Sequence, residues 1–143
     1  MPSLSEIRRV NASLPTGSPL VAVVAGGTTG IGSYIVKALA RTFATQGENL
    51  RIYIVGRNAA RAANVTAEAR TLSPGVDVRF VKSPDLALVS EVDRCCEEIT
   101  RMEGEGPLSG GTGRVDLLYM TYSYPILKER SSASILIAME KGW

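Results

Sequence analysis

Four glycines stand close together in the segment AGGTTGIG, at positions 26, 27, 30 and 32. They separate an apolar run, LVAVVA, from an amphipathic helical pattern. At such a junction the first backbone N–H groups of the helix lack partners and favour a phosphate. Glycine permits a sharp turn close to a pyrophosphate, and Gly32 lets the helix approach the strand. The spacing therefore predicts a nucleotide-binding turn, and the alternative is a tight turn without a ligand.

Other chemistry is limited by residue types that the chain lacks. It contains no histidine, which excludes Ser-His-Asp and Cys-His catalysis and most zinc enzyme sites. Cys95 and Cys96 are adjacent, with no second pair to complete a metal site, so we expect ordinary core and near-core thiols and no metal. The glycine-rich stretch at 103–114 has no P-loop lysine and predicts a surface connection.

Apolar runs of strand length alternate with helical patterns along the chain. The predicted strands are 20–26, 50–56, 76–81 and 115–120. The predicted helices are a leading one within 3–14, then 31–43, 57–72 and 85–102. This alternation predicts an α/β fold, a Rossmann-like doubly wound parallel sheet of about four strands in the order 3-2-1-4.

Periodicity also assigns the helix faces. Ser3 and Glu6 have the spacing of a capping box at the start of the leading helix. The buried stripe expected after the glycines is Ile31, Ile35, Leu39 and Phe43, with Val36 and Ala40 beside it. The face expected for 85–102 is Leu88 or Val89, Val92, Cys96 and Ile99.

Length and charge bound the class of protein. The 143 residues predict one domain, in which 1–20 form a leading helix and loop and 129–143 an atypical tail. A formal net charge of +2 is too small to indicate nucleic acid or an anionic membrane. No apolar run approaches the ~20 residues of a membrane span, and we see no secretory signal. We expect a soluble, cytoplasmic protein with a small-molecule substrate.

The segment AGGTTGIG resembles the Thr-Gly-x-x-x-Gly-Ile-Gly fingerprint of the short-chain dehydrogenase/reductases, with Ala25 in place of the threonine. RIYIVGRN, DLLYM and the leading NASLP look like a branch common in fungal secondary metabolism. The resemblance implies an NADP(H)-dependent oxidoreductase acting on a carbonyl or alcohol of a small metabolite. The alternatives are a catalytically silent nucleotide-binding or interaction module, and a non-redox isomerase or cyclase.

The resemblance also implies roles for single residues in binding the cofactor. Residues of the glycine turn would line the pyrophosphate, namely Gly26, Gly30, Ile31 and Gly32, and Thr28 and Thr29 would add hydroxyl donors. Asp85 matches the position that contacts the adenine amino group, with Leu86 beside it. The alternative for Asp85 is a helix N-cap.

Arg57 and Asn58 follow the second predicted strand, where a member that prefers NAD would carry a carboxylate. No Asp or Glu lies between residues 49 and 67. A guanidinium suits a 2′-phosphate, so NADP is the expected cofactor. The alternative for Arg57 is a solvated surface arginine.

The catalytic part of the family pattern is missing. TYSYPIL replaces the Asn-Asn-Ala-Gly that usually follows the fourth strand. Tyr124 and Lys128 have the Tyr-x-x-x-Lys spacing, but they follow the strand too closely and Pro125 disfavours helix at Tyr124. We therefore assign no catalytic residue and expect a truncated chain. The fourth strand would leave an open edge, which invites pairing and predicts self-association. The tail segment SILIAM would either cover that edge or supply a partner surface.

Overall fold

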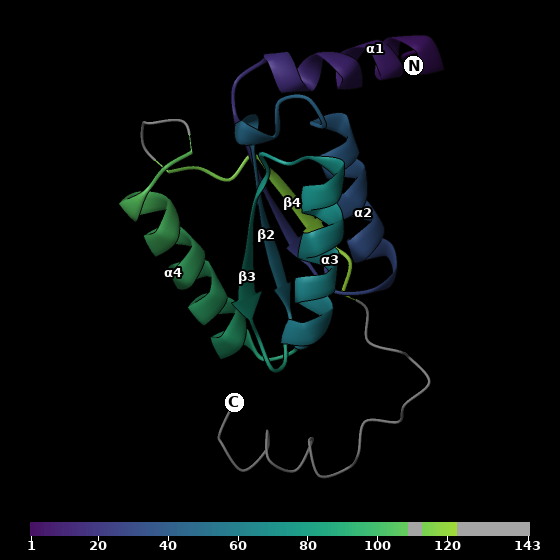
Figure 1. Ribbon diagram of the computed structural model, residues 1–143. Helices are drawn as coiled ribbons and strands as arrows, with labels where there is room; N and C mark the ends of the chain where they lie inside the picture. Colours follow the sequence, from purple (N-terminus) through teal and green to yellow (C-terminus); the bar gives the residue numbers. More distant parts are fainter. Residues whose placement is uncertain (109–112, 123–143) are drawn as a thin grey trace, which may run out of the picture.

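The computed structural model describes residues 1–108 and 113–122. Its parallel sheet has four strands in the order β3-β2-β1-β4, with α2 and α3 on one face and α4 on the other (Figure 1). The strands are β1 (Leu20–Ala25), β2 (Leu50–Gly56), β3 (Asp77–Lys82) and β4 (Leu117–Met120). The helices are α1 (Leu4–Ser13), α2 (Gly30–Thr42), α3 (Ala59–Leu72) and α4 (Val89–Glu105), with short 3₁₀ turns at Leu14–Thr16 and Gly47–Asn49. The predicted fold class and strand order are confirmed.

The two central strands are apolar on both faces because helices cover both. The side chains of β1 and β2 alternate between two cores. Ala22, Val24, Ile52 and Ile54 pack beneath α2 and α3, whereas Val21, Val23, Tyr53 and Val55 pack beneath α4. Burial on both faces explains why these strands read as continuous apolar runs in the sequence.

Helix α2 packs on the sheet with a shorter stripe than periodicity predicted. Val36, Ala40 and Phe43 are fully buried, whereas Ile31 is 73% exposed. The assignment of Ile31 to the buried stripe was wrong. Ile31 belongs to the first turn of α2, which borders a cleft at the ends of the strands instead of covering the sheet.

The buried face of α4 is also different from the predicted one. It consists of Cys95, Ile99 and Glu103, at a spacing of four residues. Of the face predicted from periodicity, Ile99 alone is buried, and the exposed members are Leu88, Val89, Val92 and Cys96. The reason is that Glu103, which apolar periodicity cannot assign to a core, faces the sheet.

Glu103 belongs to a charged network at the amino ends of β2 and β3. Its Oε1 accepts hydrogen bonds from Arg51 Nη1 at 2.7 Å and from the Tyr53 hydroxyl at 2.6 Å. Arg51 also donates to Asp77 Oδ2 at 2.7 Å and to the Gly106 carbonyl at 2.7 Å. Burial, followed by the hydrogen bond to Glu103, raises the pKa of Tyr53 to about 12. The network fixes the end of α4 to the sheet.

Helix α1 begins as its sequence predicted but contributes nothing to the core. Ser3 N–H donates to Glu6 Oε2 at 2.6 Å, and Ser3 Oγ accepts from Glu6 N–H at 3.3 Å, which completes the capping box. No residue of α1 is buried. Figure 1 shows the helix extending beyond the amino ends of the strands.

Strand β4 forms one edge of the described sheet. Leu117 and Tyr119 are half-buried against the core, while Leu118 and Met120 are 62% and 78% exposed. Within the described residues, 1–108 and 113–122, β1 is the only strand that pairs with β4. Self-association through this edge stays a prediction, because SILIAM and the 129–143 tail lie outside the described residues.

Candidate functional site

The turn between β1 and α2 packs tightly against the neighbouring strands. Gly26 has a φ of 83°, a left-handed conformation that favours glycine, and its N–H donates to the Val55 carbonyl at 2.9 Å. A Cβ on Gly32 would lie 2.2 Å from the Gly26 carbonyl oxygen and 2.7 Å from Thr121 Oγ1. Glycine at position 32 is therefore what allows α2 to begin so close to β1.

The start of α2 lacks a side-chain cap. Ser3 caps α1 and Asn58 caps α3, but Thr29, the N-cap residue of α2, makes no such hydrogen bond within the described part of the chain. The first N–H groups of an α-helix have no partners inside the helix. Those of α2 are therefore available to an anion, and the partial positive charge of the helix start adds to the attraction.

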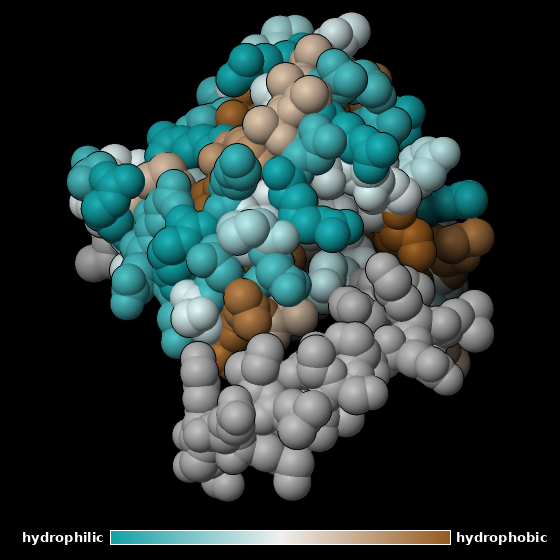
Figure 2. Space-filling model, turned by 90° about the horizontal axis from the view of Figure 1, so that it is seen from below, coloured by the Kyte–Doolittle hydropathy of each residue, from teal (hydrophilic) through white to brown (hydrophobic). Residues whose placement is uncertain are grey.

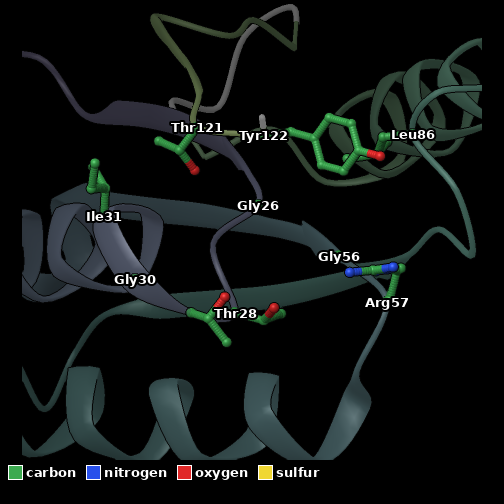
Figure 3. Close-up of a pocket in the computed structure, with 10 residues that line it drawn as sticks. Gly26, Thr28, Gly30, Ile31, Gly56, Arg57, Leu86, Thr121 and Tyr122 are labelled. Carbon is green, nitrogen blue, oxygen red and sulfur yellow. The ribbon is translucent and has the colours of Figure 1, made fainter. Parts of the chain in front are cut away.

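A cleft of about 330 Å³ lies at the carboxyl ends of β1, β2 and β4. Seven of the ten predicted site residues line it: Gly26, Thr28, Thr29, Gly30, Ile31, Arg57 and Leu86. In Figure 3 the Tyr122 ring and Leu86 lie on one side of Gly26, and Thr28 and Gly30 on another. This arrangement fits the rule that ligands of open parallel sheets bind outside the carboxyl ends of the strands.

A second cavity of about 530 Å³ shares Thr28, Thr29 and Arg57 with the first. It adds Asn58, Ala59 and Arg61, so its described lining carries two guanidinium groups and no carboxylate. Neither arginine forms a salt bridge with another described residue. The two cavities are therefore adjacent and share a wall; we call them together the groove, and its end at Arg57 and Arg61 is cationic.

Two of the predicted residues, Gly32 and Asn58, have structural roles. Gly32 lies outside the lining of both cavities and serves the packing of α2 on β1. Asn58 lines the second cavity, and its Oδ1 also accepts from the Arg61 N–H at 3.0 Å as the N-cap of α3.

Asp85 is not a helix cap. Helix α4 begins only at Val89, with Leu88 as its N-cap residue, so that alternative was wrong. Asp85 Oδ1 accepts from the Ala87 N–H at 2.9 Å and closes the turn before the helix. Asp85 lines neither cavity, and its contact with adenine stays a prediction.

Sequence reasoning missed five lining residues, Gly56, Ala59, Arg61, Thr121 and Tyr122. Thr121 and Tyr122 directly follow β4, and position at the carboxyl end of a strand was the signal that could have found them. The Ala25 carbonyl accepts from Thr121 N–H at 3.0 Å and from its Oγ1 at 2.8 Å. These two bonds fix the chain after β4 beside the glycine turn. Tyr124 and Lys128, which have the Tyr-x-x-x-Lys spacing but were not assigned a catalytic role, lie outside the described residues.

The surface around this end is mainly hydrophilic. Figure 2 looks onto the molecule from below the view of Figure 1 and shows separate hydrophobic groups within a largely polar surface. None of the helices described here is both long enough and apolar enough to cross a membrane.

Comparison with known proteins places the chain in a family. No protein-family model matches it. It is 56% identical over 141 residues to the short-chain dehydrogenase/reductase SAT2 of Stachybotrys chartarum, covering 98% of this chain and 40% of that protein. The chain belongs to the short-chain dehydrogenase/reductase family. It is also 38% identical over 141 residues to the oxidoreductase andH of Emericella variicolor, covering 98% of this chain and 35% of that protein.

Solved structures show the same fold. The MalC reductase/Diels-Alderase of Malbranchea aurantiaca matches with a TM-score of 0.60 at 14% identity, over 86% of this chain and 43% of that one. The L-sorbose reductase of Gluconobacter frateurii, complexed with NADPH and L-sorbose, matches with a TM-score of 0.56 at 23% identity, over 82% and 39%. The chain therefore has the Rossmann fold of these enzymes and spans well under half the length of its matched relatives.

Proposed function

We propose that this chain binds NADP(H) along the groove at the carboxyl ends of β1, β2 and β4. The observation that carries the proposal is that the two adjacent cavities share Thr28, Thr29 and Arg57 in their linings. One cavity presents the uncapped start of α2, which suits a pyrophosphate. The other presents Arg57 and Arg61, which suit the 2′-phosphate on the adenosine ribose.

NADP(H) is favoured over NAD(H) by the charge of this lining. A site for NAD presents a carboxylate to the ribose 2′-OH, whereas a 2′-phosphate requires cations. The described lining of the second cavity supplies two arginines and no acidic residue. The presence of NADPH in the L-sorbose reductase structure supports the same choice.

The proposed reaction is hydride transfer between the cofactor and a carbonyl or alcohol carbon of a small metabolite, in fungal secondary metabolism. Bound NADPH would supply the hydride. Among the described residues no tyrosine precedes a lysine by four positions. These residues therefore account for cofactor binding alone, and the second candidate is a module that binds the nucleotide without turnover. A cytoplasmic location remains a prediction.

Isothermal titration of the full chain with NADPH and with NADH tests the cofactor. We expect tighter binding of NADPH. Arg57→Ala and Arg61→Ala should each weaken NADPH binding about 10-fold to about 100-fold, the effect of losing a hydrogen bond to a charged group worth ~1.5–3 kcal/mol. Binding of NADH should change little, because it has no 2′-phosphate.

Arg41→Ala is the matched control, since Arg41 is exposed in the last turn of α2 and lines neither cavity. It removes the same charge and should leave both affinities unchanged. Equal weakening of NADPH and NADH by Arg57→Ala would refute the 2′-phosphate assignment. An assay of NADPH oxidation with a panel of carbonyl compounds then distinguishes the two candidate functions: turnover indicates the enzyme, and binding without turnover indicates the silent module.

A further inference from the structure

Tyr122 is the one aromatic residue in the described lining of the first cleft. It occupies the place where the sequence departs from the family pattern after the fourth strand. Tyr122 is intermediate in exposure, so it is neither fully covered nor fully open to solvent. Figure 3 shows this ring reaching toward Leu86, which comes from the turn between β3 and α4.

The backbone of Tyr122 is held firmly beside the glycine turn. Thr121 donates twice to the Ala25 carbonyl, from its N–H at 3.0 Å and its Oγ1 at 2.8 Å. A Cβ on Gly26 would lie 3.2 Å from Tyr122 N and 2.9 Å from Thr121 Oγ1. Because Gly26 has no side chain, Thr121 and Tyr122 can lie directly beside it. The backbone from which the Tyr122 ring projects is therefore fixed at the wall of the cleft.

The position of Arg57 limits which part of the cofactor can reach Tyr122. The 2′-phosphate and the adenine base are attached to the same ribose, so a base lies about one sugar width from the cation that binds the phosphate. Arg57 lines the same cleft as Leu86 and Tyr122. The base at this end of the groove therefore meets an aliphatic and an aromatic side chain.

We propose that Tyr122 stacks on the adenine base of NADP(H), with Leu86 completing the apolar wall. This inference rests on the proposed function. Together with the arginine cavity, it gives the described chain contacts for both the base and the 2′-phosphate of the adenosine half of the cofactor. The chain then binds adenosine 2′,5′-bisphosphate without help from a nicotinamide site.

The test is titration of the full chain with adenosine 2′,5′-bisphosphate and with NADPH. We expect the bisphosphate to bind within about 10-fold of NADPH. Tyr122→Ala should weaken both ligands about 5-fold to about 100-fold, as base–aromatic stacks do. Tyr122→Phe, which keeps the ring, should bind as the wild type does. Tyr34→Ala is the control, because Tyr34 is 67% exposed on α2 and lines neither cavity.

A spectroscopic readout separates stacking from a purely structural role. In proton NMR, the ring current of Tyr122 should shift adenine H2 and H8 upfield in the wild type and in Tyr122→Phe, and this shift should vanish in Tyr122→Ala. Circular dichroism checks that each variant is folded.

Two results would overturn the inference alone while the proposed function stands. They are normal binding of both nucleotides by Tyr122→Ala, and a loss in Tyr122→Phe as large as in Tyr122→Ala. Failure of the folded wild type to bind either nucleotide would overturn the proposed function and the stacking together. If Arg57→Ala weakens NADPH binding while either of the first two results is obtained, the proposed function stands and only the stacking is refuted.

Discussion

Replacing Gly32 with alanine should force the start of α2 away from β1. The new Cβ would lie 2.2 Å from the Gly26 carbonyl oxygen and 2.7 Å from the Gly26 carbonyl carbon. It would also lie 2.7 Å from Thr121 Oγ1, which is tied to the Ala25 carbonyl. The two Gly26 atoms are backbone and the Thr121 hydroxyl is held by its hydrogen bond, so the start of the helix itself must shift to restore ordinary contact.

The expected cost follows from two opposing effects. Overpacking of this kind costs ~1–3 kcal/mol, and contact with backbone atoms places Gly32→Ala at the upper end. The higher helix propensity of alanine offsets up to ~1 kcal/mol. The free energy of unfolding should therefore fall by about 2 kcal/mol, which lowers Tm by roughly 6–8 °C for a domain of this size.

The assay is urea and thermal unfolding followed by circular dichroism. Gly104→Ala is the matched control, because Gly104 lies within α4 and a Cβ there would meet nothing within 4 Å. It should stabilise the protein by up to ~1 kcal/mol. Unfolding of Gly32→Ala at or above the wild-type temperature, or equal shifts in both variants, would refute the packing role of Gly32.

Two other features predict measurable effects. The pKa of Tyr53 is raised from 10.0 to about 12 by burial and by Glu103, so the folded protein keeps a phenolic proton that the unfolded chain loses. Its contribution to stability is complete below pH 10 and lost as the pH rises to about 12, and urea unfolding of Tyr53→Phe should lack this dependence. Asn58→Ala should cost about 1 kcal/mol in thermal unfolding by removing the cap of α3. Asn58→Asp should keep the cap but weaken NADPH in titration, and an unchanged affinity would contradict a 2′-phosphate beside residue 58.

The fold was predictable because its signals are long and repeated. The apolar runs at 20–26 and 50–56 are typical of strands buried on both faces, and crossovers between parallel strands have one hand. The glycine turn is similarly marked, since two of its positions, Gly26 and Gly30, have positive φ values of 83° and 52°. These features depend on residues that are close together in the sequence, so one sequence is enough to predict them.

The errors in the predicted buried faces arose where residues far apart in the sequence determine whether a side chain is buried. Glu103 is buried because Arg51 and Tyr53, which lie 52 and 50 positions earlier, supply its hydrogen bonds. Apolar periodicity could not reveal such a partner. Ile31 has the right spacing for the core, but the end of the sheet leaves it beside the cleft. Tyr122 lines the cleft because β4 pairs with β1. The sequence does not state this pairing directly.

Two arginines at opposite ends of β2 differ in how available their guanidinium groups are: Arg51 is the second residue of the strand, and Arg57 directly follows it. Arg51 is 6% exposed and bound to Asp77, Glu103 and a carbonyl, whereas Arg57 is exposed in the shared groove. Buried ion pairs are screened by salt far less than exposed charges are. Rising ionic strength should therefore empty the groove of an anionic ligand well before it loosens the sheet, so that occupancy and folding respond to salt separately.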